Sequence, residues 1–147
     1  MEIFIACPYN TVTGGVELLH QLCYELNKYD NVKAYIWYPM IKNPNNDNIC
    51  HPDAYTKYYC PKAIKEPDKD TILIFPEIRA KNVLADIYRD NIKFIYWESV
   101  DNYLAHTESS KKFLFADNTY HIVQSYYALD FLINQVKVNR EDIIEDL

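Results

Sequence analysis

Five short apolar runs constrain the fold of this chain most strongly. They span residues 2–7, 32–38, 71–77, 92–99 and 120–125. Each run is rich in Ile, Val, Phe or Tyr and is mostly continuous rather than alternating. That pattern is typical of strands covered on both faces, as in a parallel sheet. The chain has 147 residues, enough for one domain with a sizeable buried core.

The segments between these runs show helical spacing. Apolar residues recur at i, i+3, i+4 and i+7 in two places, Leu19, Leu22, Cys23 and Leu26, and Leu129, Leu132, Ile133 and Val136. A shorter stripe lies within residues 79–90, and residues 100–117 are expected to be partly helical. Alternating strands and helices predict an α/β fold, a three-layer sandwich with a mostly parallel Rossmann-like sheet and helices on both faces. We expect a single Rossmann-like domain over residues 1–147.

Three other segments carry less regular patterns. Residues 39–54 are rich in Pro, Asn and Asp and predict a long loop. Residues 55–59 are interpreted as a further edge strand. Residues 138–147 begin a helix-like element, and no closing strand is expected after it. We therefore expect the fold to be continued by a further segment or by a partner.

The charge balance argues against nucleic acid as a partner. The formal net charge is −6, and the only adjacent bases are Lys111 and Lys112. A nucleic-acid-binding domain usually carries a basic stripe. Membrane contact is expected to be peripheral at most. The start of the chain lacks a basic segment and a long apolar segment, so it does not resemble a signal peptide, and a cytoplasmic location is expected.

The four cysteines offer little support for a metal site. Cys7 and Cys23 lie in apolar patterns and are interpreted as small buried hydrophobic residues. Cys50, His51 and Cys60 lie in a polar region and leave a zinc site as the alternative. Because the chain has no CxxC pair, reduced thiols are the favoured interpretation. No metal and no cofactor are expected.

The two glycines of the chain are adjacent, at positions 14 and 15. They follow the first apolar run and precede a helical pattern that starts near Val16. Unpaired amides at a helix N-terminus favour an anion, and glycine lets a ligand approach the backbone closely. We expect a phosphate or a sugar at this loop. A tight turn required only for packing is the alternative.

Familiar nucleotide-binding motifs are absent. The fingerprint GxGxxG needs a third glycine, and GxxxxGK[ST] does not occur. The second apolar run ends in Trp37, Tyr38 and Pro39, where a dinucleotide-binding fold often places an acid. The sequence therefore argues against a Rossmann NAD site and against a P-loop.

Residues 5–28, "IACPYNTVTGGVELLHQLCYELNK", resemble the opening of a retaining GT-B glycosyltransferase of the bacterial polysaccharide type. Residues 93–103 and 121–132 are similar to later segments of the same N-terminal domain. The resemblance implies a two-domain enzyme in which Gly14, Gly15 and Val16 reach toward the diphosphate of a nucleotide-sugar donor. It also implies that a C-terminal domain with a Glu-x7-Glu motif binds most of the donor. No such motif is found in a suitable context here, so we expect this chain alone to be incomplete and inactive.

Polar residues at the ends of the predicted strands are the candidates for the acceptor side of that site. They are Tyr9, Asn10, Glu17, Glu77, Ser99, Asp101, His106, Ser125 and Tyr126. Glu98 is the catalytic candidate, because the neighbouring Tyr96 and Trp97 would desolvate its carboxyl group. The alternatives are structural: a helix-dipole acid for Glu17, a helix cap for Glu77, a salt bridge or cap for Glu98, and an N-cap for Ser125. His20 and His121 are interpreted as structural.

The expected function is sugar transfer from a nucleotide-sugar donor to a glycan or lipid-linked acceptor. The main alternative is a non-catalytic module that binds a glycan or pairs with another subunit. A small-molecule enzyme on a Rossmann-like sheet is a third hypothesis, and the missing dinucleotide fingerprint argues against it.

Overall fold

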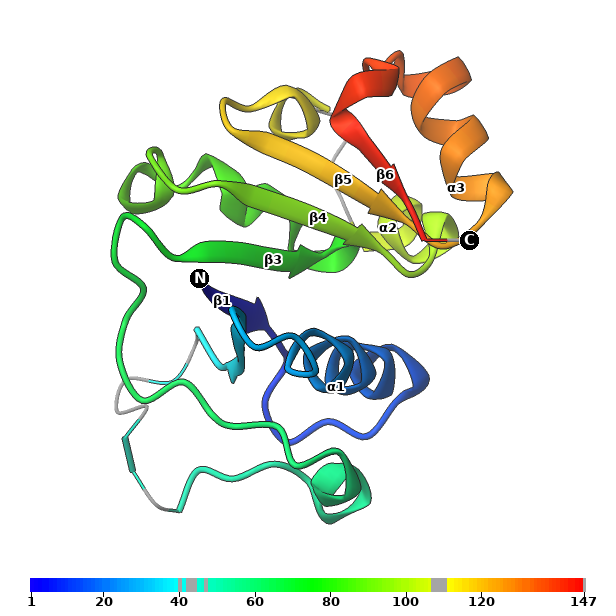
Figure 1. The fold of residues 1–147 in the computed structure, drawn as a ribbon. Helices are drawn as coiled ribbons and strands as arrows, with labels where there is room; N and C mark the ends of the chain where they lie inside the picture. Colours follow the sequence, from blue (N-terminus) through cyan, green and yellow to red (C-terminus); the bar gives the residue numbers. More distant parts are fainter. Residues whose placement is uncertain (40, 42–44, 47, 107–110, 147) are drawn as a thin grey trace. The chain divides into compact units, whose positions relative to one another are not determined.

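The computed structural model describes residues 1–39, 41, 45–46, 48–106 and 111–146, apart from the side chains of Ala105 and His106. The chain divides into two compact units, Met1–Leu73 and Ile74–Leu147 (Figure 1). The expectation of a single domain over residues 1–147 stays a prediction. Among the described residues, no helix combines the length and the apolar character that crossing a membrane requires.

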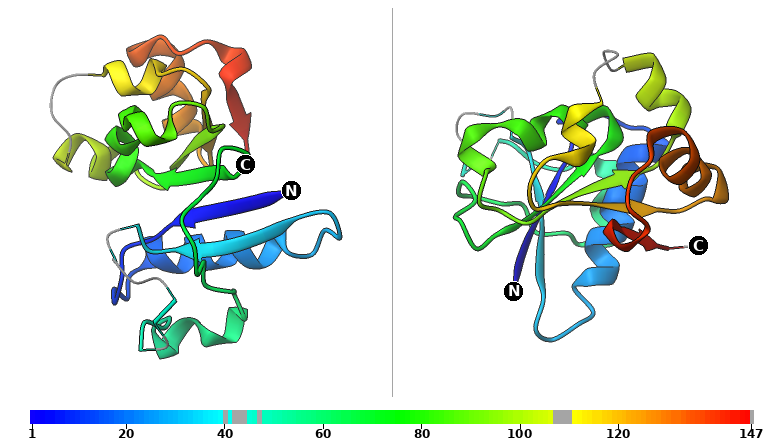
Figure 2. Two further views of the ribbon diagram at one scale, coloured as in Figure 1. Left: turned by 90° about the vertical axis from the view of Figure 1, so that its left-hand side faces the viewer. Right: turned by 90° about the horizontal axis from the view of Figure 1, so that it is seen from above.

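The first unit is built on a parallel strand pair and one long helix. Strand β1 (Glu2–Ala6) pairs with β2 (Lys33–Trp37), with Ile3 opposite Ala34. Helix α1 (Gly14–Leu26) connects them and packs beside β2 (Figure 2, left panel). The side chain of Asn27, which caps α1, accepts from the backbone N–H of Ala34 at 2.8 Å and donates to its carbonyl at 2.9 Å. This pair of hydrogen bonds fixes the end of α1 against β2.

The expected edge strand at residues 55–59 is wrong. Residues Asp53–Tyr58 form the 3₁₀ helix η1, which Tyr59 ends in the left-handed region at φ 52°. A 3₁₀ helix has three residues per turn, so side chains at i and i+3 lie on one side. Tyr55 and Tyr58 both use this side to hydrogen-bond with residues 13–17. The aromatic pattern therefore reflects contact with α1 rather than strand pairing.

The second unit contains a parallel sheet with the order β3-β4-β5-β6. Its strands are β3 (Ile72–Pro76, which begins at the boundary of the units), β4 (Lys93–Trp97), β5 (Thr119–Val123) and β6 (Ile143–Glu145). Its helices are η2 (Glu77–Leu84), η3 (Asp86–Tyr88), α2 (Val100–His106), η4 (Lys112–Phe115), α3 (Tyr126–Asp130), the π-helical η5 (Phe131–Val136) and η6 (Arg140–Asp142). Trp97 pairs with Val123 and His121 with Ile143 in the parallel ladders.

The predicted α/β class with a parallel Rossmann-like sheet is confirmed. All five apolar runs contain a strand, and helical segments connect them. The end of the chain corrects one expectation: residues 143–145 form β6, which pairs with β5, where no closing strand was expected. The stripe at 79–90 forms short 3₁₀ helices, and Leu84 and Ile87 on it are exposed. The expected loop at 39–54 includes residues 40, 42–44 and 47, which lie outside the described ones.

The core of the second unit is aromatic. Trp97 contacts Tyr103 of α2 and Phe131 of η5, with ring centroids 4.9 and 5.8 Å apart. His121 is fully buried beside them and accepts a hydrogen bond from Nε1–H of Trp97 at 3.0 Å. Its Nε2–H donates to the carbonyl of Leu114 at 3.0 Å. The core thus fixes the carboxyl ends of β4 and β5, where several candidate residues follow.

Candidate functional site

The glycine loop lies where the sequence predicts it, between the end of β1 and α1. Thr13 is the N-cap of α1. Its hydroxyl oxygen accepts a hydrogen bond from the backbone N–H of Val16 at 3.2 Å, and its carbonyl oxygen accepts one from the backbone N–H of Glu17 at 3.0 Å. The N–H groups of Gly14 and Gly15 belong to the first turn, where an α-helix offers them no carbonyl. The loop therefore presents amides at the positive end of the α1 dipole.

The protein itself does not require a glycine at position 14. No glycine in the described residues has a positive φ. A β-carbon built on Gly14 meets nothing within 4 Å. A tight turn required only for packing is therefore not supported at Gly14. The space beside the Gly14 backbone is free for a ligand.

Helix η1 holds the loop in place. The hydroxyl of Tyr55 donates to the carbonyl of Thr13 at 2.9 Å, and that of Tyr58 donates to Oε1 of Glu17 at 2.6 Å. Lys57 lies 3.4 Å from the same carboxylate. The hydrogen bond from Tyr58 and the charge of Lys57 lower the pKa of Glu17. Glu17 is thus a charged support for the loop, and both side chains contact its Oε1.

The other candidates of the first unit lie just past β1. Tyr9 is 38 % exposed and packs edge-on against Tyr38, with ring centroids 5.3 Å apart. Asn10 is exposed and adopts the left-handed region at φ 54°, a conformation that Asn tolerates better than most residues. Both residues therefore lie at the carboxyl end of β1, as predicted.

Glu77 begins η2 directly after β3, and its side chain is 1 % exposed. Its two carboxyl oxygens accept from the backbone N–H groups of Glu98 and Ser99, at 3.2 and 3.1 Å. Burial raises its pKa against the lowering effect of these hydrogen bonds. Glu77 therefore organises the loop after β4, and its carboxyl group is enclosed rather than open to a ligand. The alternative role of Glu77 as a helix cap is not observed, because Pro76 is the N-cap of η2 and no side chain caps this helix.

Glu98 follows β4 and carries the most perturbed carboxyl group of the site. Burial, and then the negative charge of Glu77, raise its pKa to about 8. Its Oε1 is buried and has no hydrogen-bond partner. A carboxyl group with these properties is mostly protonated at neutral pH, so it is able to donate a hydrogen bond as well as accept one.

The remaining candidates lie on the turns and in the helices α2 and α3 that follow β4 and β5. The Ser99 hydroxyl accepts from the N–H of Asn102 at 3.2 Å, and that of Ser125 accepts from Ala128 at 3.1 Å, so both begin helices. Exposed Asp101 accepts from the hydroxyl of Tyr127 at 3.0 Å. Tyr126 is 77 % exposed. His106 ends α2, and its side chain lies outside the described part.

Gln124 is a polar residue that the sequence analysis missed. It follows β5 directly, and its Nε2 is buried without a hydrogen-bond partner. Glu98 follows β4 in the same way, and the register pairs the residues before them, Trp97 and Val123. The sequence did contain a signal for Gln124, because it is the first polar residue after the apolar run "HIV" at residues 121–123. The first polar residue after a buried strand falls at the carboxyl edge of the sheet.

The zinc alternative finds no support in the geometry of His51. The hydroxyl of Tyr38 donates to its Nδ1 at 2.6 Å, and its Nε2–H donates to the carbonyl of Cys60 at 2.7 Å. Both ring nitrogens are therefore occupied. Within the described part of the chain, no three His, Cys, Asp or Glu side chains gather as a metal site would require.

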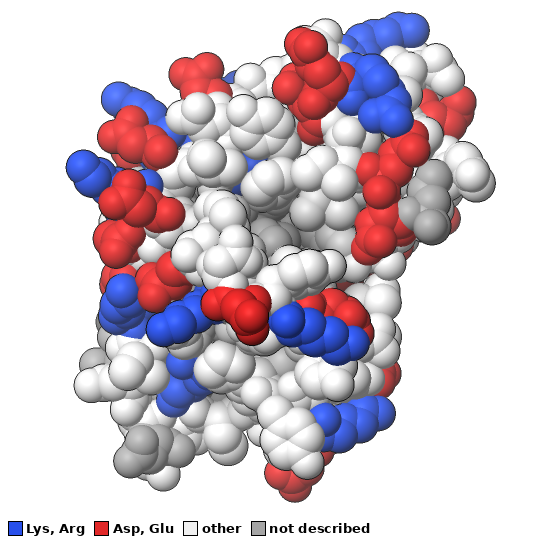
Figure 3. All heavy atoms as spheres, viewed as in Figure 1, with Lys and Arg blue, Asp and Glu red and all other residues white. Residues whose placement is uncertain are grey.

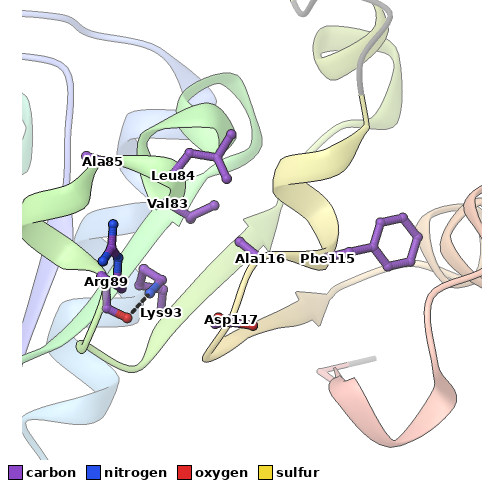
Figure 4. A pocket seen from close by; sticks show the side chains of 8 residues that line it. All are labelled: Val83, Leu84, Ala85, Arg89, Lys93, Phe115, Ala116 and Asp117. Carbon is purple, nitrogen blue, oxygen red and sulfur yellow. Dashed lines mark hydrogen bonds between the residues drawn. The ribbon is translucent and has the colours of Figure 1, made fainter.

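A pocket of about 290 Å³ lies at the opposite edge of the second unit, near the start of β4 (Figure 4). Val83, Leu84 and Phe115 form part of its wall. Buried Lys93 donates to the carbonyls of Tyr88, Arg89 and Asn91 at 2.9–3.3 Å, and the Arg89 side chain pairs with Asp86 at 2.8 Å. Both cations are thus engaged within the protein, and the acidic residue Asp117 also lines the pocket. None of the predicted site residues lines it.

Acidic and basic side chains are interspersed on the face shown in Figure 3. Comparison of the chain with known protein families, curated proteins and solved structures finds no match. The resemblance to a glycosyltransferase therefore stays a prediction from the sequence segments 5–28, 93–103 and 121–132.

Proposed function

We propose that this chain is the acceptor-side, N-terminal domain of a glycosyltransferase that transfers a sugar from a nucleotide-sugar donor to a glycan or lipid-linked acceptor. In this proposal, a second domain supplies most of the donor contacts. The glycine loop approaches the donor diphosphate, and polar residues at the strand ends contact the acceptor. Transfer takes place on the cytoplasmic side, where nucleotide sugars are made.

The observation that carries the proposal is the pair of glycines at the start of α1. The backbone of Gly14 has no positive φ, and a β-carbon at this position would meet no neighbouring atom within 4 Å, so the fold does not account for a glycine here. The loop is nevertheless held by Tyr55 and Tyr58, so its amides are preorganised. Fixed N–H donors at a helix N-terminus stabilise negative charge that develops on a leaving diphosphate, without reorganisation during the reaction.

The test is sugar transfer by the protein that contains this chain together with its donor domain. Turnover is measured with UDP- and GDP-linked sugars and a mixed glycan acceptor. Gly15→Val places a branched side chain against the proposed diphosphate position and is expected to lower turnover at least about 100-fold. Glu25→Val, at an exposed position near the other end of α1, is the matched control. Unchanged turnover in Gly15→Val would remove the proposed role of the loop.

A separate binding measurement distinguishes the main alternative. If the protein binds glycans but transfers no sugar from any donor, the non-catalytic module replaces the enzyme. Titration of the chain with inorganic pyrophosphate reports directly on the loop, and Gly15→Val is expected to weaken that binding about tenfold or more.

A further inference from the structure

Two buried polar atoms in the second unit lack hydrogen-bond partners at the same edge of the sheet. They are Oε1 of Glu98 and Nε2 of Gln124. Buried polar atoms in folded proteins are nearly always hydrogen-bonded, so an unpartnered pair in one place calls for an explanation. A ligand that supplies the missing partners is such an explanation.

The strand register relates the two residues, because each is the first residue after a paired strand position. Trp97 of β4 is paired with Val123 of β5 in a parallel ladder, and Glu98 and Gln124 are the next residues of each strand. Neighbouring strands lie about 4.8 Å apart, and side chains alternate between the two faces. Continued one residue past the last pair of the ladder, this alternation puts Glu98 and Gln124 on the same face, opposite to Trp97.

The hydrogen-bonding groups indicate what such a ligand carries. The amide Nε2 of Gln124 is only a donor, so it needs an oxygen acceptor. The protonated carboxyl group of Glu98 both donates and accepts. Glu77 next to it already disfavours a further negative charge. An uncharged group with two neighbouring oxygens satisfies both residues without adding a second negative charge beside Glu77.

We infer that Glu98 and Gln124 form a hydrogen-bonding site for two neighbouring oxygen atoms of an uncharged sugar ring. Gln124 donates to one oxygen, and Glu98 hydrogen-bonds to the adjacent hydroxyl. Glu77 positions the backbone from which Glu98 extends. The choice of a sugar rests on the proposed function. The pairing of the two residues is independent of the glycine loop.

The experiment measures binding of neutral methyl glycosides to the protein by ligand-observed NMR. The probes are the methyl glycosides of glucose, galactose, mannose and N-acetylglucosamine. Gln124→Leu removes the donor while keeping a similar volume. It is expected to weaken binding about tenfold and to leave the thermal midpoint unchanged or higher, because an unpaired buried amide is removed. Gln135→Leu, at an exposed position of η5 in the same unit, is the matched control and is expected to bind as the wild type does.

A second variant tests the pairing. Glu98→Leu is expected to weaken glycoside binding by a similar factor. In the double variant, glycoside binding is expected to weaken by less than the product of the factors measured for the two single variants, because both residues contact the same ligand. Fully independent effects contradict a shared site.

Two results would overturn the inference. One is that the wild-type protein binds none of the glycosides at millimolar concentration, in which case water is the partner of Oε1 of Glu98 and Nε2 of Gln124. The other is a Gln124→Leu variant that binds normally, or that loses binding only together with its thermal midpoint.

Sugar transfer is measured separately. Gln124-dependent glycoside binding without transfer contradicts the enzyme but not this site. Transfer that Gln124→Leu leaves unchanged contradicts this site but not the enzyme.

Discussion

Glu77 accepts a backbone hydrogen bond from Glu98 at 3.2 Å, although the two residues are 21 positions apart in the chain. A second hydrogen bond, from the N–H of Ser99 to the other oxygen of Glu77, completes the contact. One buried carboxyl group thus connects the end of β3 to the loop after β4. Burial, and then the charge of this carboxyl group, raise the pKa of the Glu98 side chain, so Glu77 affects both the position and the protonation of Glu98.

Replacing Glu77 by Gln is expected to lower the free energy of unfolding by about 1–3 kcal/mol. Glutamine offers one acceptor oxygen, and its NH₂ group would face a backbone N–H. Urea unfolding followed by circular dichroism measures the change. Asp86→Asn is the control, because the Asp86 side chain is 91 % exposed and its ion pair with Arg89 contributes little. Equal losses in the two variants would contradict the role of Glu77.

The raised pKa of Glu98 predicts that stability falls as pH rises. In the unfolded chain this carboxyl group loses its proton near its ordinary pKa of 4.5, whereas in the folded protein it keeps the proton up to about pH 8. Between these values the folded state binds more protons, so the free energy of unfolding decreases by at most about 1.4 kcal/mol per pH unit. Above pH 8 the effect is complete.

Glu98→Gln removes this dependence. Relative to the wild type, the Glu98→Gln variant is therefore expected to become more stable as the pH rises from 5 to 8. Urea unfolding of both proteins at half-unit intervals measures it. The comparison cancels contributions from the histidines, which titrate in both proteins. A constant difference across this range would show that Glu98 has an ordinary pKa.

His121 is expected to stay neutral down to about pH 4. Burial lowers its pKa to about 4, and both its ring nitrogens have hydrogen-bond partners. The unfolded chain binds the proton near pH 6.5, so stability is lost as pH falls from 6.5 toward 4. Long-range ¹H–¹⁵N NMR at pH 5.5 should show a neutral ring with the proton on Nε2. The urea-unfolded chain is the reference, and titration near pH 6.5 in the folded protein would contradict the assignment.

The strands were predictable because their signal is local. Runs such as residues 2–7 and 92–99 are apolar throughout, which identifies strands buried on both faces without knowledge of their neighbours. Strand β6 was not predictable in the same way. Of its three residues only Ile143 is buried, and it forms by pairing with β5. Helix η1 was missed because a Tyr-rich segment has high strand propensity, which the contacts of Tyr55 and Tyr58 with the start of α1 override.

The positions of the candidate residues after the strands were predictable, but the contacts of their side chains were not. The rule that ligands bind at the carboxyl ends of parallel strands directed attention to Glu77 and Glu98. That Glu77 is enclosed and serves the backbone of Glu98 depends on packing between segments 21 residues apart. Gln124 was missed because its significance depends on the register between β4 and β5, which the sequence does not specify.

Gly14→Ala separates the needs of the fold from those of a ligand. The added β-carbon meets nothing within 4 Å and the backbone of Gly14 has no positive φ, so the folded state accommodates alanine. Alanine also restricts the unfolded chain and favours helix. The variant is therefore expected to be more stable by about 0.4–1 kcal/mol, measured by urea unfolding.

The same variant is expected to bind inorganic pyrophosphate more weakly, because its methyl group occupies the space beside the amides of the α1 first turn. Titration calorimetry on wild type and Gly14→Ala under identical salt measures this. A stabilised protein with weakened binding assigns the glycine to the ligand. If instead stability falls, glycine at position 14 is required by the fold, and the argument from free space beside its backbone fails.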